Sequence, residues 1–280
     1  MCDFHSILGI AIGGTYSIRH DPSNSHSGMT DTFVNQPNRV PVIFEAECSA
    51  DLMLATDDID SIKSKIIRNY GECPEALVRE IVAHYRRVKE ALTGGKHLAP
   101  DGYFADTAKW ADVWNAAISR NVTFQFPAVF QGNLEVSGTA KLDAPALTEV
   151  VGNLGVYGTA RLDALTKVGG YLAVSGTARL DALTKVGGYL VMSAAAKLDA
   201  PALTEVVGYL DVYGTTKLDA LTKVGGYLDV SGTARLDAPA LTEVVGNLGV
   251  YGTARLDALT KVGGYLDVSG TLIAPKLNRI

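Results

Sequence analysis

The chain has 280 residues, of which 47% are hydrophobic and 20% charged, a composition typical of a globular protein and not of a disordered one. Its net charge of -5 argues against a nucleic-acid binder, which has an excess of basic residues, and against a DNA mimic, which is densely acidic. No run approaches the ~18 apolar residues of a membrane span, and the N-terminus lacks the basic residues of a secretory signal. The three cysteines are far apart, which argues against a disulfide framework and favours a reducing cytoplasm.

The first 125 residues contain a mixed set of predicted elements. Residues 7–20 are typical of a β-hairpin with Gly13-Gly14 at its turn, and residues 40–50 favour a further strand. Three helices are predicted, at 58–71, 74–95 and 104–119. Strands followed by helices predict an α+β domain over residues 1–125 that also caps the C-terminal part of the chain.

Reactive side chains gather near the N-terminus. One thiolate and three imidazoles within the first 26 residues are ligand types that zinc binds in tetrahedral sites: Cys2, His5, His20 and His26. A nucleophilic site is a second hypothesis. Its nucleophile would be Ser25, Ser6 or Cys2, with His5 or His26 as base and Asp3 or Asp21 orienting the base. The spacing fits no zinc-finger class, and no Gly-x-Ser-x-Gly elbow or HExxH helix is present. Turn chemistry explains these polar residues equally, so we expect no enzyme and no cofactor, with zinc as an open alternative.

Two segments of this region resemble viral sequences. "RNYGECPEALVREIVAHYRRVKEALTGGKHL" and "YFADTAKWADVWNAAI" are similar to the N-terminal region of bacteriophage and prophage proteins of unknown function that end in varied short repeats. The resemblance spans about residues 1–120 and brings no known activity with it. It implies a viral origin, the cytoplasm of a bacterial host, and a host protein as partner.

Near residue 125 the composition changes and the chain begins to repeat itself. The motif G-x-L-x-V-x-G-T-x-x-L-D-A-(P-A)-L-T-x-V recurs every 18 or 20 residues, beginning at Gly132, Gly152, Gly170, Gly188, Gly208, Gly226, Gly246 and Gly264. Within each copy Leu and Val fall two residues apart, and so do Leu and Ala, which predicts two short strands per copy. So short a unit cannot bury its own apolar face. We therefore expect about eight copies to stack as the coils of a parallel β-solenoid over residues 126–280.

The repeat resembles the short leucine-rich-repeat-like solenoids related to receptor L domains, over residues 132–280. It departs from the common leucine-rich form because it lacks the asparagine ladder. This departure favours a flatter β-helix over a helix-backed horseshoe, and the resemblance implies no function.

Because strand side chains alternate, each outward position of the repeat is expected to form a column along the rod. The predicted basic column is Lys141, Arg161, Arg179, Lys197, Lys217, Arg235 and Arg255, and an acidic column two residues on is Asp143, Asp163, Asp181, Asp199, Asp219, Asp237 and Asp257. Neighbouring columns of opposite sign predict a solvated face that neutralises itself. A threonine column is similar to the ladders of ice-binding solenoids, but Ala195 interrupts it and turn geometry explains it as well.

The outward positions of the Leu-x-Val strand carry eight tyrosines. They are Tyr157, Tyr171, Tyr189, Tyr209, Tyr213, Tyr227, Tyr251 and Tyr265. Tyrosine supplies contact area at low entropic cost and is enriched at interfaces, so these residues predict a face that binds a protein partner, with inhibition of that partner as one outcome. The alternative is that aromatic neighbours simply stabilise the sheet.

The last copy is cut short as "GTLIAPKLNRI". Its apolar residues predict an open strand edge and a homo-oligomer joined through the C-terminal coil: Leu272, Ile273, Leu277 and Ile280. Two other functions stay open. The first is a metal-dependent or nucleophilic hydrolase with the solenoid as its targeting arm, and the second is a self-assembling structural protein. Membrane and nucleic-acid partners are not expected.

Overall fold

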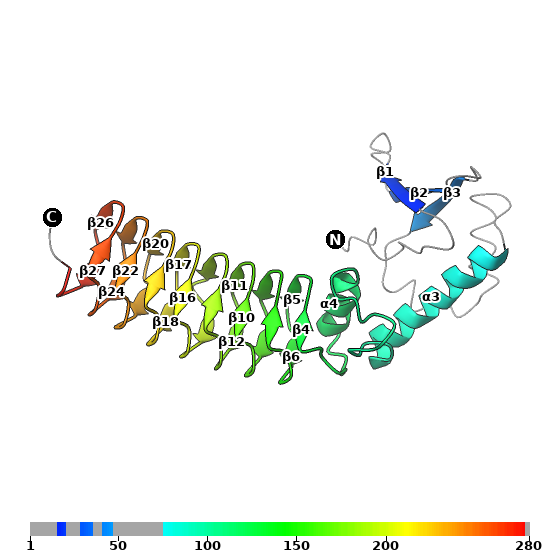
Figure 1. The fold of residues 1–280 in the computed structure, drawn as a ribbon, viewed down its shortest axis with the longest axis horizontal. Coiled ribbons are helices and arrows are strands. Elements are labelled where there is room, and N and C mark those ends of the chain that lie inside the picture. The colour runs from blue at the N-terminus through cyan, green and yellow to red at the C-terminus, as the bar shows by residue number, and fades with distance from the viewer. Residues whose placement is uncertain (1–15, 21–28, 36–40, 47–74, 278–280) are drawn as a thin grey trace. The chain divides into compact units, whose positions relative to one another are not determined.

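The computed structural model describes residues 16–20, 29–35, 41–46 and 75–277 (Figure 1). The chain divides into two compact units, Met1–His97 and Leu98–Ile280. The second unit holds the solenoid and begins well before residue 126, because the segment that precedes the first coil packs with it. In the described parts of the chain, no helix is long and apolar enough to cross a membrane.

The described part of the first unit contains three strands and one helix. The strands β1 (Tyr16–His20), β2 (Met29–Asn35) and β3 (Pro41–Ala46) pair antiparallel in the order β1-β2-β3, and α3 covers Glu75–Gly94. The predicted strand at 40–50 and the predicted helix at 74–95 are thus confirmed in β3 and α3. The predicted helix at 58–71 lies outside the described residues, so the α+β domain as a whole stays a prediction.

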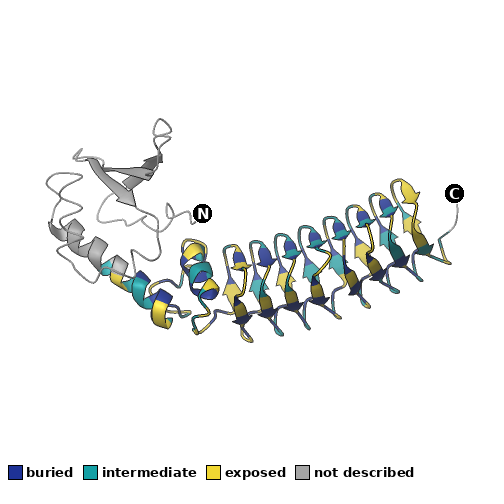
Figure 2. Cartoon of the chain, turned by 180° about the vertical axis from the view of Figure 1, so that it is seen from behind, coloured by how far each residue is buried: buried dark blue, intermediate teal, exposed yellow. Residues whose placement is uncertain are grey.

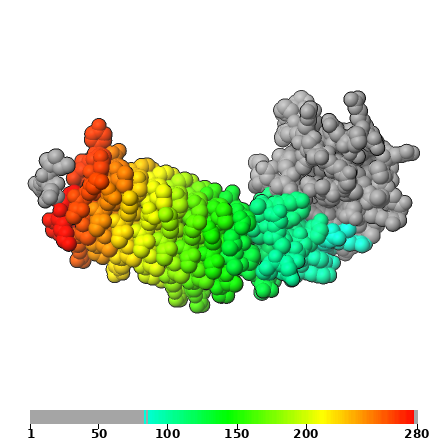
Figure 3. Space-filling view, viewed as in Figure 1, coloured from blue at the N-terminus to red at the C-terminus, as the bar shows by residue number. Residues whose placement is uncertain are grey.

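The second unit is a parallel β-solenoid of about eight coils, with coil stacked on coil in chain order (Figures 1 and 3). A complete coil contains three strands, so the prediction of two was wrong. The additional strand has two residues, which is too short for alternation to reveal. It forms the sheet that we call the Lys/Glu sheet: β4 (Val129–Phe130), β7 (Glu149–Val150), β10 (Lys167–Val168), β13 (Lys185–Val186), β16 (Glu205–Val206), β19 (Lys223–Val224), β22 (Glu243–Val244) and β25 (Lys261–Val262).

The Leu-x-Val strands form a second sheet, called the tyrosine sheet. It consists of β5 (Leu134–Val136), β8 (Leu154–Val156), β11 (Leu172–Val174), β14 (Leu190–Met192), β17 (Leu210–Val212), β20 (Leu228–Val230), β23 (Leu248–Val250) and β26 (Leu266–Val268). The remaining strands form the third column, which is split into two sheets of four. The first is β6 (Lys141–Asp143), β9 (Thr159–Arg161), β12 (Thr177–Arg179) and β15 (Lys197–Asp199), and the second is β18 (Thr215–Lys217), β21 (Arg235–Asp237), β24 (Thr253–Arg255) and β27 (Thr271–Ile273).

The core runs along the inside of the coils (Figure 2). One coil contributes five aliphatic side chains with no exposed surface, Leu154, Val156, Leu162, Leu165 and Val168. Each such side chain stabilises the fold by about 1.5–3 kcal/mol relative to an exposed one. The coils approach one another closely at the glycine turns, where a Cβ on Gly187 would lie 2.2 Å from the carbonyl oxygen of Gly169 in the preceding coil.

The register of the third column corrects the predicted charge columns. Lys141 pairs with Thr159, and Asp143 with Arg161, an offset of two residues from the repeated motif. The sequence suggests that the longer copies insert Pro-Ala after this strand, but the chain takes up the two residues before it, in the turn 137–140. Acids and bases are therefore mixed in one column, which runs Asp143, Arg161, Arg179 and Asp199, followed beyond the split by Lys217, Asp237 and Arg255.

A cap of side chains closes the N-terminal end of the solenoid. The helix α4 (Ala111–Ser119) is shorter than the predicted 104–119 and packs on β5 and β6, with Trp114 fully buried against Phe124, Phe126 and Phe130. At this end of each of the three strand columns, one backbone N–H donates a hydrogen bond to a polar side chain of the cap. Gln131 N donates to Thr107 Oγ1 at 2.8 Å, Glu135 N to Asn115 Oδ1 at 2.9 Å, and Lys141 N to Asn121 Oδ1 at 2.7 Å.

Candidate binding face

Four tyrosines of the tyrosine sheet stack ring on ring along the solenoid. The ring centroids of Tyr171 and Tyr189, Tyr189 and Tyr209, and Tyr209 and Tyr227 lie 4.7, 4.6 and 4.6 Å apart, with interplanar angles of 5°, 6° and 4°. The spacing follows from parallel in-register strands, which repeat at about 4.8 Å. All eight predicted tyrosines flank strands of this sheet at outward positions.

Asparagine replaces tyrosine at both ends of the stack. Asn153 Oδ1 accepts a hydrogen bond from Tyr171 N at 3.0 Å, and Asn247 Oδ1 accepts one from Tyr265 N at 2.8 Å. Each amide thus binds the backbone of the next coil and ends the aromatic row. Tyr227, at the C-terminal end of the stack, is 40% exposed, whereas the other three rings are half-buried.

A second, interrupted row of rings lies at the other end of the same strands, with serines at the positions between the tyrosines. Tyr157, Tyr213 and Tyr251 are 44–45% exposed. Two of them lie over glycines, since a Cβ on Gly155 would come within 2.8 Å of the Tyr157 ring, and one on Gly249 within 3.1 Å of the Tyr251 ring. The Tyr157 and Tyr251 rings therefore lie partly against the sheet and keep one surface toward solvent.

Between the two rows, the middle residue of each strand changes character along the solenoid. After Glu135, the first half carries small or apolar residues at this position, and the second half is mostly acidic. In chain order the residues are Glu135, Gly155, Ala173, Val191, Asp211, Asp229, Gly249 and Asp267. Asp211 and Asp229 are register partners. Burial, followed by the neighbouring Asp229 charge, raises the pKa of Asp211. Burial and the Asp211 charge likewise raise the pKa of Tyr227 to about 12.

The other two faces carry acids together with bases, and many of these charges form ion pairs. In the Lys/Glu sheet, Lys167 reaches Glu149 at 2.7 Å, Lys185 reaches Glu205 at 2.7 Å, and Lys261 reaches Glu243 at 2.6 Å. In the third column, paired side chains two residues apart lie 2.6–2.8 Å from each other, in Arg161–Asp163, Arg179–Asp181, Lys217–Asp219 and Arg255–Asp257. By contrast, the outward positions of the tyrosine sheet carry four acids and, over its described residues, neither lysine nor arginine.

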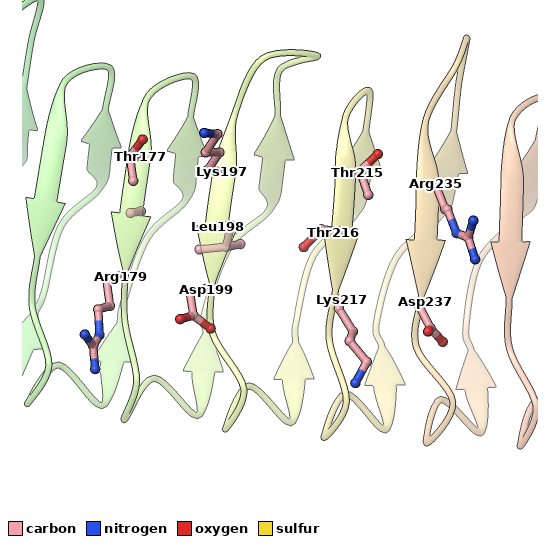
Figure 4. A pocket seen from close by; sticks show the side chains of 11 residues that line it. Thr177, Arg179, Lys197, Leu198, Asp199, Thr215, Thr216, Lys217, Arg235 and Asp237 are labelled. Carbon is pink, nitrogen blue, oxygen red and sulfur yellow. The ribbon is translucent and has the colours of Figure 1, made fainter.

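A cleft of about 620 Å³ opens where the third column splits, between β15 and β18 (Figure 4). Its rim carries charges of both signs, including Lys197, Asp199, Arg235 and Asp237, and its floor includes Leu198 and Thr216. Thr216 is 5% exposed, and its hydroxyl lacks a hydrogen-bond partner among the described residues.

The turn before β15 explains the split. Two longer copies of the repeat place a glycine with positive φ at this turn, Gly138 (57°) and Gly232 (64°), and the next strand then bonds back through Thr159 N–Ala140 O and Thr253 N–Ala234 O, each at 2.9 Å. The third longer copy has Ala194 there, and a Cβ disfavours positive φ. Its turn differs, and β18 does not pair with β15 in the described sheet order.

A second threonine ladder, at the corner before the Lys/Glu sheet, was missed in the sequence. Each hydroxyl donates to a backbone carbonyl of the preceding coil at 2.9–3.2 Å, in Thr148, Thr166, Thr184, Thr204, Thr222, Thr242 and Thr260. Their strict recurrence before Glu-Val or Lys-Val was the available signal. These threonines therefore link neighbouring coils through side chain-to-backbone hydrogen bonds.

Most of the N-terminal chemical candidates lie outside the described residues. Cys2, His5, Ser25 and His26 are among these, and His20 is the last residue of β1. Over the residues that the structure describes, no three His, Cys, Asp or Glu side chains gather as metal ligands. Of the predicted self-association residues, Leu272 and Ile273 lie on β27, Leu277 comes after it, and Ile280 is outside the described residues.

No family model matches the chain, and neither does any curated protein or solved structure.

Proposed function

We propose that this protein is a non-enzymatic binding protein that presents the tyrosine sheet to a protein partner. The observation that carries the proposal is the row of four stacked tyrosines with a second, exposed row beside it. Stacked rings lose little conformational freedom on binding, and tyrosine offers both apolar area and a hydroxyl. The resemblance of residues 1–120 to phage proteins favours a partner in a bacterial host.

The test compares two variants of the full-length chain. The first replaces Tyr171, Tyr189, Tyr209 and Tyr227 by serine. The matched control replaces three valines by serine at another corner of the coils, Val151, Val207 and Val245, which are 41–43% exposed. Circular dichroism establishes that both variants remain folded.

Tagged wild-type protein and both variants are then used to purify partners from a bacterial extract. We expect a stoichiometric protein with the wild type and the valine variant, and its loss with the tyrosine variant. A folded tyrosine variant that retains the same protein in the same amount would refute the proposal.

A second proposed function, self-association, is favoured by the last coil. Leu266, Val268 and Ile273 are 41–49% exposed, whereas the equivalent Leu248 and Val250 of the preceding coil are fully buried. Leu266 and Val268 stack on Leu248 and Val250 of the preceding coil, so a second copy of the chain offers apolar side chains of the same kind. Because the opposite end is capped by α4 and polar side chains, contact between two C-terminal ends gives a closed dimer and not a filament.

Light scattering at micromolar concentration tests self-association. We expect twice the chain mass for the wild type and a single chain mass for Val268→Lys, with Val207→Lys as an exposed control that stays dimeric. A wild-type monomer would refute this second proposal and leave the tyrosine sheet unaffected.

A further inference from the structure

The charges of the tyrosine sheet indicate what kind of partner fits it. This inference rests on the proposed function, because it names the chemistry of the partner for the same face. On the Lys/Glu sheet and along the third column, acids stand among bases, and many of them form ion pairs. The tyrosine sheet has acids and, across its described outward positions, no base to pair with them.

Two of these acids stand next to each other. Asp211 and Asp229 occupy the same register position on β17 and β20, so their backbones are one strand spacing apart, about 4.8 Å. Asp211 Oδ1 is buried and has no hydrogen-bond partner among the described residues. The nearby donors are hydroxyls, since Ser231 donates to Asp229 and Tyr227 donates to Asp211 Oδ2 at 3.4 Å. Adjacent like charges that no cation compensates destabilise the free protein.

An aromatic ring lies beside this carboxylate pair, because the Tyr227 hydroxyl reaches Asp211. The tyrosine stack ends at Tyr227, because the next position is Asn247, so the outer face of the Tyr227 ring has no aromatic neighbour among the described residues. A ring face beside carboxylates attracts an ammonium or guanidinium group through cation–π attraction and direct charge pairing. A second pair of tyrosine and carboxylate lies toward the last coil, where the Tyr251 hydroxyl donates to Asp267 Oδ2 at 2.7 Å.

The spacing of the acids favours an extended segment over a single small cation. Asp211 and Asp267 lie on β17 and β26, three coils apart, which corresponds to about 14 Å. An extended chain covers this distance with about four or five residues, and long lysine or arginine side chains reach several carboxylates at once.

We propose that the C-terminal half of the tyrosine sheet, with Asp211, Tyr227, Asp229, Tyr251 and Asp267, binds a lysine- or arginine-rich extended segment of a protein. The carboxylates neutralise the cations of this segment, and the tyrosines pack against their aliphatic stems. Part of the affinity arises because the partner removes the repulsion between Asp211 and Asp229.

The probe is a fluorescein-labelled peptide of about eight residues that alternates lysine and glycine, long enough to span the acids when extended. A glutamate–glycine peptide of the same length is the negative control. Fluorescence anisotropy at low salt measures binding to the full-length protein and to two triple variants. One replaces Asp211, Asp229 and Asp267 by asparagine, and the matched control replaces Asp163, Asp181 and Asp257, so both change the net charge equally.

We expect the Asp211/Asp229/Asp267 variant to bind the lysine peptide about tenfold more weakly than the wild type, equivalent to about 1.4 kcal/mol. The control variant is expected to lose less than about threefold in affinity. Added salt weakens wild-type binding. Misfolding does not confound the result, because asparagine relieves the repulsion between neighbouring acids. Equal losses in the two variants, no loss in either, or no binding by the wild type would overturn the proposal.

The partner captured from extract separates this inference from the proposed function. In one outcome, the serine variant of the four stacked tyrosines loses the partner, but the Asp211/Asp229/Asp267 variant binds it at full affinity. This outcome supports the tyrosine face as a binding site and refutes its preference for lysine- or arginine-rich segments. A partner retained by the tyrosine variant refutes the proposed function itself.

Discussion

Replacing Thr216 by valine tests the account of the split in the third column. Thr216 is 5% exposed, and its position on the strand is taken by alanine or leucine in other coils, as in Ala254 and Leu236. Its buried hydroxyl has no hydrogen-bond partner among the described residues. Thr216→Val keeps the shape of the side chain and replaces this hydroxyl by a methyl group.

A buried polar group without a partner costs about 1–3 kcal/mol, so we expect Thr216→Val to raise the free energy of unfolding by about this amount. For a unit of this size, each kcal/mol corresponds to an increase of about 2–4 °C in Tm. Urea and thermal unfolding followed by circular dichroism measure both quantities, with the exposed Thr215→Val on the same strand as the control. A Thr216→Val variant less stable than wild type would show that the hydroxyl is paired, and the reasoning would be refuted.

Three further predictions concern the turn, the cap and the stack. Ala194→Gly permits the positive φ of the equivalent turns, so we expect β18 to pair with β15 and the Thr215 amide to gain protection from hydrogen exchange; unchanged exchange would contradict the role of this turn. Asn115→Ala removes two bonds, to Asn133 O and from Glu135 N, and is expected to lower stability by about 1–3 kcal/mol in urea unfolding, with a loss under about 0.5 kcal/mol contradicting the cap. Folding raises the pKa of Tyr227 from its ordinary value of 10.0 to about 12. Its neutral phenol therefore contributes stability below pH 10, and this contribution is lost as the pH rises from 10 through 12. In an ultraviolet titration, Tyr227→Phe should remove the last phenol to ionise, and a titration curve that keeps this late transition would contradict the assignment.

The parallel solenoid could be predicted from the sequence because a two-residue alternation repeated at 18 or 20 residues has few other solutions. The tyrosine rows could be placed for the same reason. Tyr171 and Tyr189 directly precede their strands, so the two extra residues of the longer copies, which enter after the strand, do not disturb their register.

The charge columns could not be predicted, because an alignment of motifs does not say where a coil takes up extra residues. Lys141 and Arg161 are equivalent in sequence, yet Arg161 lies beside Asp143. Asn153 and Asn247 occupy the tyrosine position of their coils, and the sequence alone does not reveal that their amides bind the next coil. That function depends on the distance between coils, which a single sequence does not contain.

The most direct test of the central claim is to purify the tagged full-length protein from a bacterial host and to measure, in one sample, the stoichiometry of co-purifying protein and the zinc content. We predict one host protein in a fixed ratio, released when the four stacked tyrosines are replaced by serine. Stoichiometric zinc without any partner would contradict the account and direct attention to Cys2, His5, His20 and His26.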